Sequence, residues 1–196
     1  DLQLVETRWE SAHRVGSQPL SSTTKIDPEQ LVDLALDPSL AEVDCERLLF
    51  LDTETTGLSG GTGTLPFMIG LGWFEASSFR MEQLLVPRPG EEGPALHRLR
   101  ERMAWASALV TYNGKSYDWP LLRTRHVMNR VPASLPTHHV DLLHVARRIF
   151  SNRLARVRLI DLEAEVLGLC REGDVDGSEI PEIYWEVVRG GEPSLL

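Results

Sequence analysis

The sequence is poor in cysteine and has no long apolar run, and each shortage excludes a class of protein. Cys45 and Cys170 are too few and too far apart for a disulfide framework or a structural zinc site. We therefore expect reduced, buried thiols in a cytoplasmic protein. No apolar run approaches the roughly 20 residues that a membrane helix requires, so we expect no membrane partner. The polar first residues show no signal-peptide pattern.

Positive charge is also in the minority. The chain has 20 Lys and Arg against 29 Asp and Glu, a net charge of −9 at pH 7, which argues against a protein that binds nucleic acid through its overall charge. The arginines are nevertheless clustered in a stretch without acids, preceded by three more. This cluster either binds phosphate groups or is a solvated helix face. It consists of Arg147, Arg148, Arg153, Arg156 and Arg158, after Arg123, Arg125 and Arg130.

The hydrophobic pattern divides the chain near residue 46. Residues 1–45 are predicted to be a leader or linker with a short helix at 28–37, where Pro28 fits the first turn. The rest is predicted to be one α/β domain, in which a three-strand antiparallel meander and parallel strands form a mixed sheet flanked by helices. We expect strands at 47–54, 65–74, 79–86 and 107–113, a short extended piece leading into a helix over 139–150, and helices at 91–106, 118–129, 160–168 and 181–191.

Two carboxylates lie at the end of one predicted strand, and a third follows another. Asp52 and Glu54 are two residues apart, so on a strand they lie on the same face. Such close like charges are costly unless a cation lies between them, and hard ions such as Mg²⁺ and Mn²⁺ prefer oxygen ligands. Alternatively, the strand simply ends in solvent with both acids hydrated. Asp118, in "YNGKSYDWPLL", follows another strand, where its alternative role is that of a helix N-cap.

These motifs resemble a known family. "FLDTETTGL" and "YNGKSYDWPLL" are similar to the first two motifs of the DnaQ-like, DEDD-type 3′-5′ exonucleases of the ribonuclease H-like superfamily. "GLSGGTGTLPFMIGLG" and "VLGLCREGDVDGSEIPEIYWEVVRGG" resemble its bacterial YprB-like branch, so the resemblance covers roughly residues 46–191. It implies a metal-dependent 3′-5′ exonuclease acting on single-stranded DNA or RNA. In it, Asp52, Glu54 and Asp118 would converge on two Mg²⁺ or Mn²⁺ ions.

The resemblance also suggests residues that contact the substrate or support the acids. Asp141 is expected to be either a supporting acid near the site or a plain helix N-cap. Tyr117 either stacks on a terminal base or is buried. The tentative nucleic-acid-binding residues are Thr55, Gly57, Leu58, Asn113, Tyr117, Arg147 and Arg153.

One element of the family pattern is missing. The family uses a fourth acid, an Asp four residues after a His or Tyr, and no His or Tyr in this sequence has an Asp at that spacing. We therefore expect a domain that is incomplete at its C-terminus, with the fourth acid beyond Leu196 and weak or no activity in this chain alone. Asp174 and Asp176 fit a turn better than the role of a substitute for the fourth acid. The alternative function is a catalytically silent nucleic-acid-binding module on the same fold.

Overall fold

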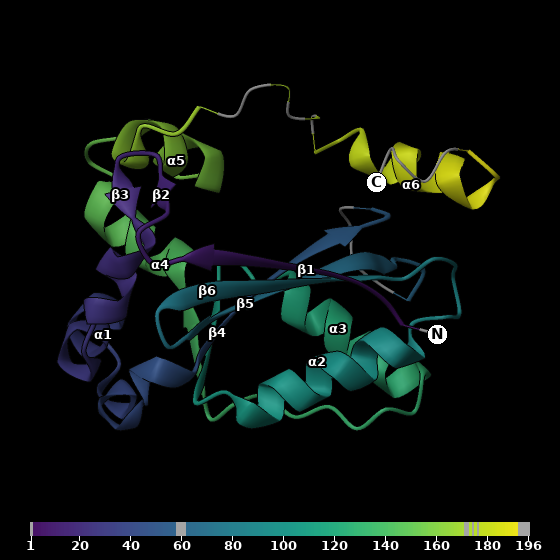
Figure 1. Ribbon diagram of the computed structural model, residues 1–196, viewed down its shortest axis with the longest axis horizontal. Coiled ribbons are helices and arrows are strands. Elements are labelled where there is room, and N and C mark those ends of the chain that lie inside the picture. Colours follow the sequence, from purple (N-terminus) through teal and green to yellow (C-terminus); the bar gives the residue numbers. More distant parts are fainter. Residues whose placement is uncertain (1, 58–61, 171–172, 174, 176, 192–196) are drawn as a thin grey trace.

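The chain forms a mixed six-stranded sheet with helices on both faces (Figure 1). The computed structural model describes residues 2–57, 62–170, 173, 175 and 177–191. The strand order is β1-β6-β5-β4-β7-β8, in which β4, β5 and β6 form the predicted antiparallel meander and β7 and β8 continue parallel to β4. The strands of this sheet are β1 (Gln3–Glu10), β4 (Leu48–Thr55), β5 (Pro66–Glu75), β6 (Ser78–Leu85), β7 (Ala108–Thr111) and β8 (His138–Asp141).

The predicted helices are all present, with ends that differ from the expected ones by a few residues. They are α1 (Pro28–Ala35), α2 (Gly93–Trp105), α3 (Asp118–Met128), α4 (Leu142–Phe150), α5 (Leu159–Leu167) and α6 (Ile180–Val188). The segment before β4 also contains a two-stranded hairpin and three short 3₁₀ turns. These are β2 (Arg14–Val15), β3 (Gln18–Pro19), η1 (Leu20–Lys25), η2 (Pro38–Glu42) and η3 (Cys45–Arg47).

The main core lies between one face of the sheet and helices α2 and α3, which lie below the sheet in Figure 1. Alternate residues of β5, among them Phe67, Ile69 and Leu71, are buried on this face with Leu96 and Leu99 of α2. The period of two along β5 is the pattern of a strand with one face on a core. The opposite face of the sheet is thereby left for α1, α4 and α5, whereas α6 contributes Tyr184 to the main core.

A buried charged group also links α2 to the sheet. Glu82 of β6 is fully buried and accepts hydrogen bonds from Arg98 and Arg102 of α2. Burial acts to raise the pKa of Glu82, but the hydrogen bonds and charges of the two arginines outweigh it and lower the pKa. The carboxylate is therefore ionised inside the interface at neutral pH.

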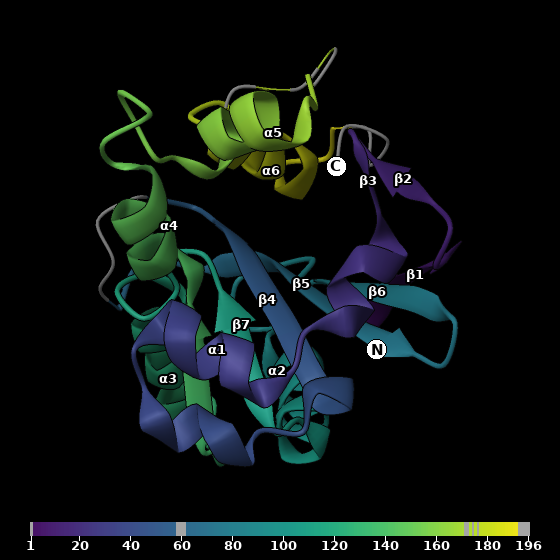
Figure 2. The ribbon, with the colours of Figure 1, turned by 90° about the vertical axis from the view of Figure 1, so that its left-hand side faces the viewer.

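The N-terminal segment is a structural part of the sheet, which its prediction as a leader did not include. Strand β1 pairs antiparallel with the whole of β6 and forms one edge of the sheet. Farther along, Leu31, Leu40 and Val43 form a second core with residues of β4, β7 and β8. Helix α1 lies beside α4 (Figure 2), where Arg148 donates to the carbonyl of Leu34. The boundary at residue 45 stays a prediction.

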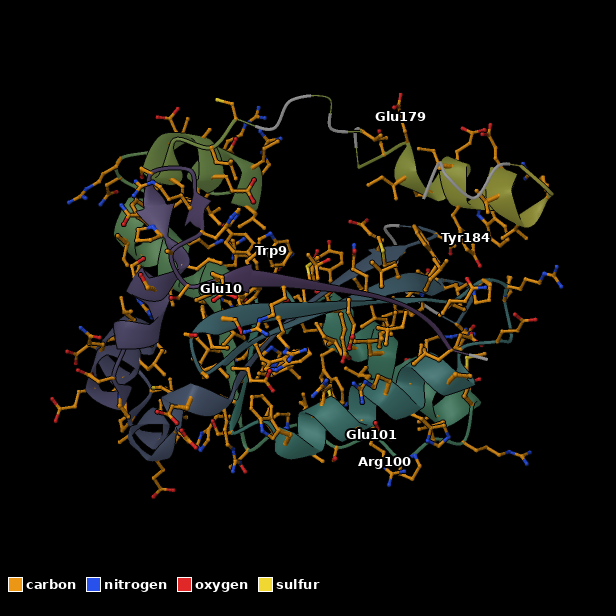
Figure 3. All side chains as sticks on the ribbon, in the orientation of Figure 1. Trp9, Glu10, Arg100, Glu101, Glu179 and Tyr184 are labelled. Atoms are coloured by element: carbon orange, nitrogen blue, oxygen red, sulfur yellow. The ribbon has the colours of Figure 1, made fainter. Side chains whose placement is uncertain are left out.

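Helix α6 is attached to the sheet through Tyr184, which points from the helix toward the strands (Figure 3). Its ring is fully buried and stacks on Phe67, with the ring centroids 4.4 Å apart. The Tyr184 hydroxyl has no hydrogen-bond partner among the residues that the structure describes. Burial raises the pKa of Tyr184 to about 12, so the hydroxyl stays protonated.

The two cysteines are less buried than expected from the sequence. Both cysteines are free thiols, but Cys45 is only half-buried and Cys170 is exposed, so the expected burial was wrong. The reason is position, since Cys170 follows α5 at the surface. In the described part of the chain, no helix combines the length and apolar character needed to cross a membrane.

Candidate active site

Asp52 and Glu54 lie near the end of β4, where the strand extends past one of its neighbours. The parallel pairing of β4 with β7 ends at Phe50, whereas its antiparallel pairing with β5 continues to Thr55, with an irregularity between Glu54 and Thr55. Side chains alternate along a strand, so both acids lie on the face opposite α2 and α3. Asp52 is exposed and Glu54 is half-buried. Irregular pairing of this kind is common beside functional sites.

The two acids line a pocket of about 380 Å³ on this face of the sheet. Its lining includes Gly70 and Gly72 of β5, which pair with Asp52 and Phe50, so β5 carries no side chain directly beside these two residues. Leu142 at the start of α4 and Leu159 at the start of α5 form its far wall. The pocket therefore combines two carboxylates with a mainly apolar lining.

Asp118 reaches the same strand from the other face. It is the buried first residue of α3, and its Oδ1 accepts a hydrogen bond from the Thr53 hydroxyl at 2.5 Å. Burial raises the pKa of Asp118, an effect that the Thr53 hydrogen bond opposes. The N-cap position of α3 belongs to Tyr117, so the alternative of Asp118 as a helix cap is wrong. Asp118 is thus held beside the residue that separates the two strand acids.

The three acids are close along β4 but do not form the converged cluster that the family resemblance implies. No group of three or more His, Cys, Asp or Glu residues suited to holding a metal occurs among the described residues. The physical reason is that Thr53 points to the α3 side and draws the Asp118 carboxylate there, whereas Asp52 and Glu54 point to the pocket side. The chemistry of Asp52 and Glu54, two carboxylates on one face, still fits a hard divalent cation.

Asp141 is the N-cap of α4, one of the two alternatives, and it also contacts the loop before α3; its supporting role at the site stays a prediction. Its carboxylate caps α4 by accepting from the backbone N–H of Leu143 at 3.0 Å. It also accepts from the backbone N–H groups of Asn113 at 2.7 Å and Lys115 at 3.0 Å. These two residues belong to the loop between β7 and α3, which leads directly into Asp118. Asp141 is buried and so ties the start of α4 to the loop that precedes Asp118.

Comparison with known proteins identifies the fold family. Residues 49–196 match the model of the RNase_H superfamily. The chain belongs to the RNase_H superfamily. It is also 40% identical over 152 residues to "Uncharacterized protein YprB" of Bacillus subtilis (strain 168), an overlap of 76% of this chain and 37% of that protein. The chain therefore spans much less than half the length of this relative.

Membership in the RNase_H superfamily agrees with the mixed six-stranded sheet and confirms the resemblance at that level. Members of this superfamily are usually nucleases that act with divalent metal ions. The two acid motifs therefore lie in a fold whose members are usually hydrolytic nucleases.

The predicted substrate-binding residues of this RNase_H superfamily member lie at several places around the acids. Thr55 follows Glu54 and donates from its hydroxyl to the Gly57 carbonyl at 2.9 Å, which shapes the chain after β4. Leu58 lies outside the described residues. Asn113 adopts a left-handed backbone with φ of 66° in the loop that Asp141 holds. Tyr117 is 58% exposed, so the alternative that it is buried is wrong.

The arginine cluster divides into exposed and structural members. Arg147 and Arg153 are exposed. Arg147 lies in α4 and Arg153 in the segment between α4 and α5, the two helices whose first residues line the acid pocket. Arg125 is buried, pairs with Glu92 and donates to the Thr62 carbonyl at 3.1 Å, so it does not belong to a phosphate-binding surface. The other exposed members are Arg123, Arg130, Arg148, Arg156 and Arg158.

Sequence reasoning missed two features of the site. No role is predicted for Thr53 from the sequence, although its hydroxyl is the hydrogen-bond partner of Asp118. The glycines at 70 and 72 were taken only as part of a strand, although they line the acid pocket. Their spacing of two residues on a strand was the available signal, because it places both on one face.

Proposed function

We propose that this protein is a metal-dependent 3′-5′ exonuclease that hydrolyses phosphodiester bonds of single-stranded nucleic acid, either DNA or RNA. The observation that carries the proposal is the position of Asp52 and Glu54 on one face of β4, in a pocket, with Asp118 bound to the residue between them. The 3′-5′ polarity and the DEDD-type assignment rest on the resemblance of the two acid motifs.

Asp52 and Glu54, on one face of β4, are the residues proposed to hold divalent metal, Mg²⁺ or Mn²⁺, and Asp118 is proposed as a further ligand once its carboxylate leaves the Thr53 hydroxyl. Two such ions would supply a hydroxide from water and stabilise the leaving 3′ oxygen. Thr53 keeps the Asp118 carboxylate against β4, and Asp141 holds the preceding loop, which makes it a positioning residue in this proposal. In this proposal the three acids supply the negative charge that binds metal, and Thr53 and Asp141 fix the position of Asp118.

The exposed arginines of the last turn of α4 and of the segment that joins it to α5 are proposed to bind the phosphates of the strand. Arg147, Arg153 and Arg156 are exposed and make no ion pair with other described residues, whereas Arg158 pairs with Asp161. Free guanidinium groups beside an acidic pocket suit a polyanion whose scissile phosphate enters that pocket. The exposed ring of Tyr117 offers a stacking surface for a base. We further propose a cytoplasmic location, in keeping with the two free thiols.

Cleavage of end-labelled strands tests this function. Intact protein is incubated with single-stranded DNA and RNA in Mn²⁺, and products are resolved by length. Asp52→Asn is expected to lower turnover by about 10²-fold or more with the melting temperature retained. Asp33→Asn on the exposed face of α1 is the control and is expected to keep wild-type activity. Equal cleavage by wild type and Asp52→Asn would overturn the proposal, as would shortening from the 5′ end.

A catalytically silent nucleic-acid-binding module is the second candidate. Two observations favour it: no cluster of three metal-binding acids occurs among the described residues, and no His or Tyr in the sequence has an Asp four residues later. Fluorescence anisotropy with a labelled strand separates the two candidates. Binding without any Mn²⁺-dependent cleavage by the intact protein supports the module, and cleavage excludes it.

A further inference from the structure

We propose that the outer edge of strand β1 pairs antiparallel with β1 of a second copy of this chain, which gives a weak symmetric dimer. Strand β1 is the edge of the six-stranded sheet and pairs with β6, and no other described strand pairs with it. In Figure 1 its ribbon runs along the front of the sheet, and no other described element is drawn across it. An exposed sheet edge of this kind can bind a further extended strand through its backbone groups.

The charges of β1 favour a second copy as the partner. Glu6 and Arg8 are exposed and lie on the same face of the strand. Arg8 makes an exposed ion pair with Glu10 of its own strand, at 3.6 Å. Across the sheet, however, Glu6 pairs in register with Glu82 and Arg8 with Arg80 of β6, and like charges in opposite positions are unfavourable. Both β6 residues already have ion-pair partners of their own. A second β1 on the outer side can place an opposite charge beside both Glu6 and Arg8.

Symmetry and charge together select the register of the dimer. A two-fold axis perpendicular to the sheet keeps each residue on its own face, so one residue of β1 must face its own copy. With Thr7 at the centre, Glu6 of each copy lies opposite Arg8 of the other, and Val5 lies opposite Trp9. Centring on Glu6 or Arg8 sets like charges against each other. Centring on Trp9 joins opposite charges but overlaps only the last residues of the strand, so the Thr7-centred register is favoured.

The second face of β1 adds apolar contact to the same register. Val5 is 59% exposed, and Trp9 is half-buried with its ring 6.2 Å from that of Phe79, between centroids. Trp9 points to the side of the sheet that carries the acid pocket, which Phe79 also lines (Figure 3). An aromatic and a β-branched residue in opposite positions form a favourable cross-strand pair. In the dimer, both acid pockets therefore face the same side of one continuous sheet.

Sedimentation equilibrium of the intact protein tests the dimer. A single strand pair is a small interface, so we expect a dissociation constant in the micromolar range or weaker. Arg8→Glu sets acids against each other at both charge contacts and is expected to weaken dimerisation about tenfold or more. Glu6→Arg is expected to do the same, because bases then face each other. Both variants are expected to keep the wild-type melting temperature, since each places opposite charges across β1 and β6.

Mixing the two variants tests the register. Arg8→Glu carries acids at both positions and Glu6→Arg carries bases at both, so a heterodimer again has opposite charges at its two contacts. The equal mixture is expected to dimerise about as tightly as wild type, although each variant alone is mostly monomeric. The control is Arg100→Glu, on the exposed outer face of α2 (Figure 3), which makes the same change in net charge as Arg8→Glu and is expected to dimerise like wild type.

Three results would overturn the proposal. They are a wild type that stays monomeric from about 1 to about 500 μM, the range in which a weak interface becomes populated, a dimer that Arg8→Glu leaves unchanged, and equal weakening by Arg8→Glu and Arg100→Glu. Two folded variants that fail to associate when mixed overturn the Thr7-centred register. The outcome is independent of the proposed nuclease function, because none of the substituted residues belongs to the acid site.

Discussion

Replacing Asp141 should reveal how firmly the loop before Asp118 is held. The two carboxylate oxygens have different partners: Oδ1 accepts from the backbone N–H groups of Asn113 and Leu143, and Oδ2 accepts from that of Lys115. Alanine removes all three hydrogen bonds. Asparagine keeps one acceptor oxygen, which can serve Asn113 and Leu143, but presents an NH₂ group to the Lys115 N–H, where two donors then face each other.

The expected magnitudes follow from these contacts. Loss of a helix N-cap costs about 1 kcal/mol, and each part-buried hydrogen bond to a charged acceptor is worth about 1.5 kcal/mol. Asp141→Ala should therefore lower the free energy of unfolding by about 3–4 kcal/mol. Asp141→Asn, which loses mainly the Lys115 bond, should lower it by about 2 kcal/mol.

Urea denaturation at neutral pH measures these differences, and amide hydrogen exchange locates them. Faster exchange at Lys115 in both variants, but at Asn113 only in Asp141→Ala, is the expected pattern. Under the proposed nuclease function, the KM and kcat of Asp141→Asn for strand cleavage separate a positioning role from a merely structural one, since a displaced Asp118 should lower kcat. Equal destabilisation by both substitutions, or a loss below about 1 kcal/mol in Asp141→Ala, would refute the hydrogen-bond reasoning.

Two further predictions concern buried groups away from the acids. The lowered pKa of Glu82, caused by Arg98 and Arg102 against the effect of burial, means that its ionisation stabilises the fold above the unfolded-state pKa of about 4.3. This stabilisation is lost as pH falls below that value. The difference in the free energy of unfolding between wild type and Glu82→Gln, measured by urea denaturation, should therefore shrink in acid. A difference that stays constant with pH contradicts the assignment. Tyr184→Phe should leave the melting temperature equal or higher, because the hydroxyl has no described partner, whereas Tyr184→Ala should cost about 3–5 kcal/mol by removing the ring stacked on Phe67. A large loss in Tyr184→Phe would show that the hydroxyl is hydrogen-bonded.

The central strands could be predicted because their residues carry a strong local signal. Continuous apolar residues lead into Asp52 in β4, and alternation marks β5, so strand type and face followed from the sequence. Strand β1 lacked such a signal, since Leu4 and Val5, neighbours on opposite faces, are both exposed in an edge strand. Apolar and polar residues alternate along a strand only when one face of the strand is buried.

The acids of the site were also predictable, but their orientation was not. Asp52 and Glu54 share a face because of strand geometry, which needs no tertiary information. The direction of the Asp118 carboxylate depends on its hydrogen bond with Thr53, which no motif indicates. The contacts of Asp141 are with backbone N–H groups. Every residue except proline has such a group, so the sequence does not show which ones Asp141 binds. Arg125 was assigned to the exposed cluster because its buried partner, Glu92, is distant in sequence.

The pairing of β1 with β6 has a consequence for how the chain is made and handled. During synthesis β1 emerges before its partner strand, which ends only at Leu85, so the residues of β1 remain unpaired until the meander is complete. Contacts this distant in sequence slow folding and prolong the exposure of strand edges. A shortened protein that starts at residue 46 would leave the hydrogen-bonding groups of β6 open along one whole side, a template for intermolecular association.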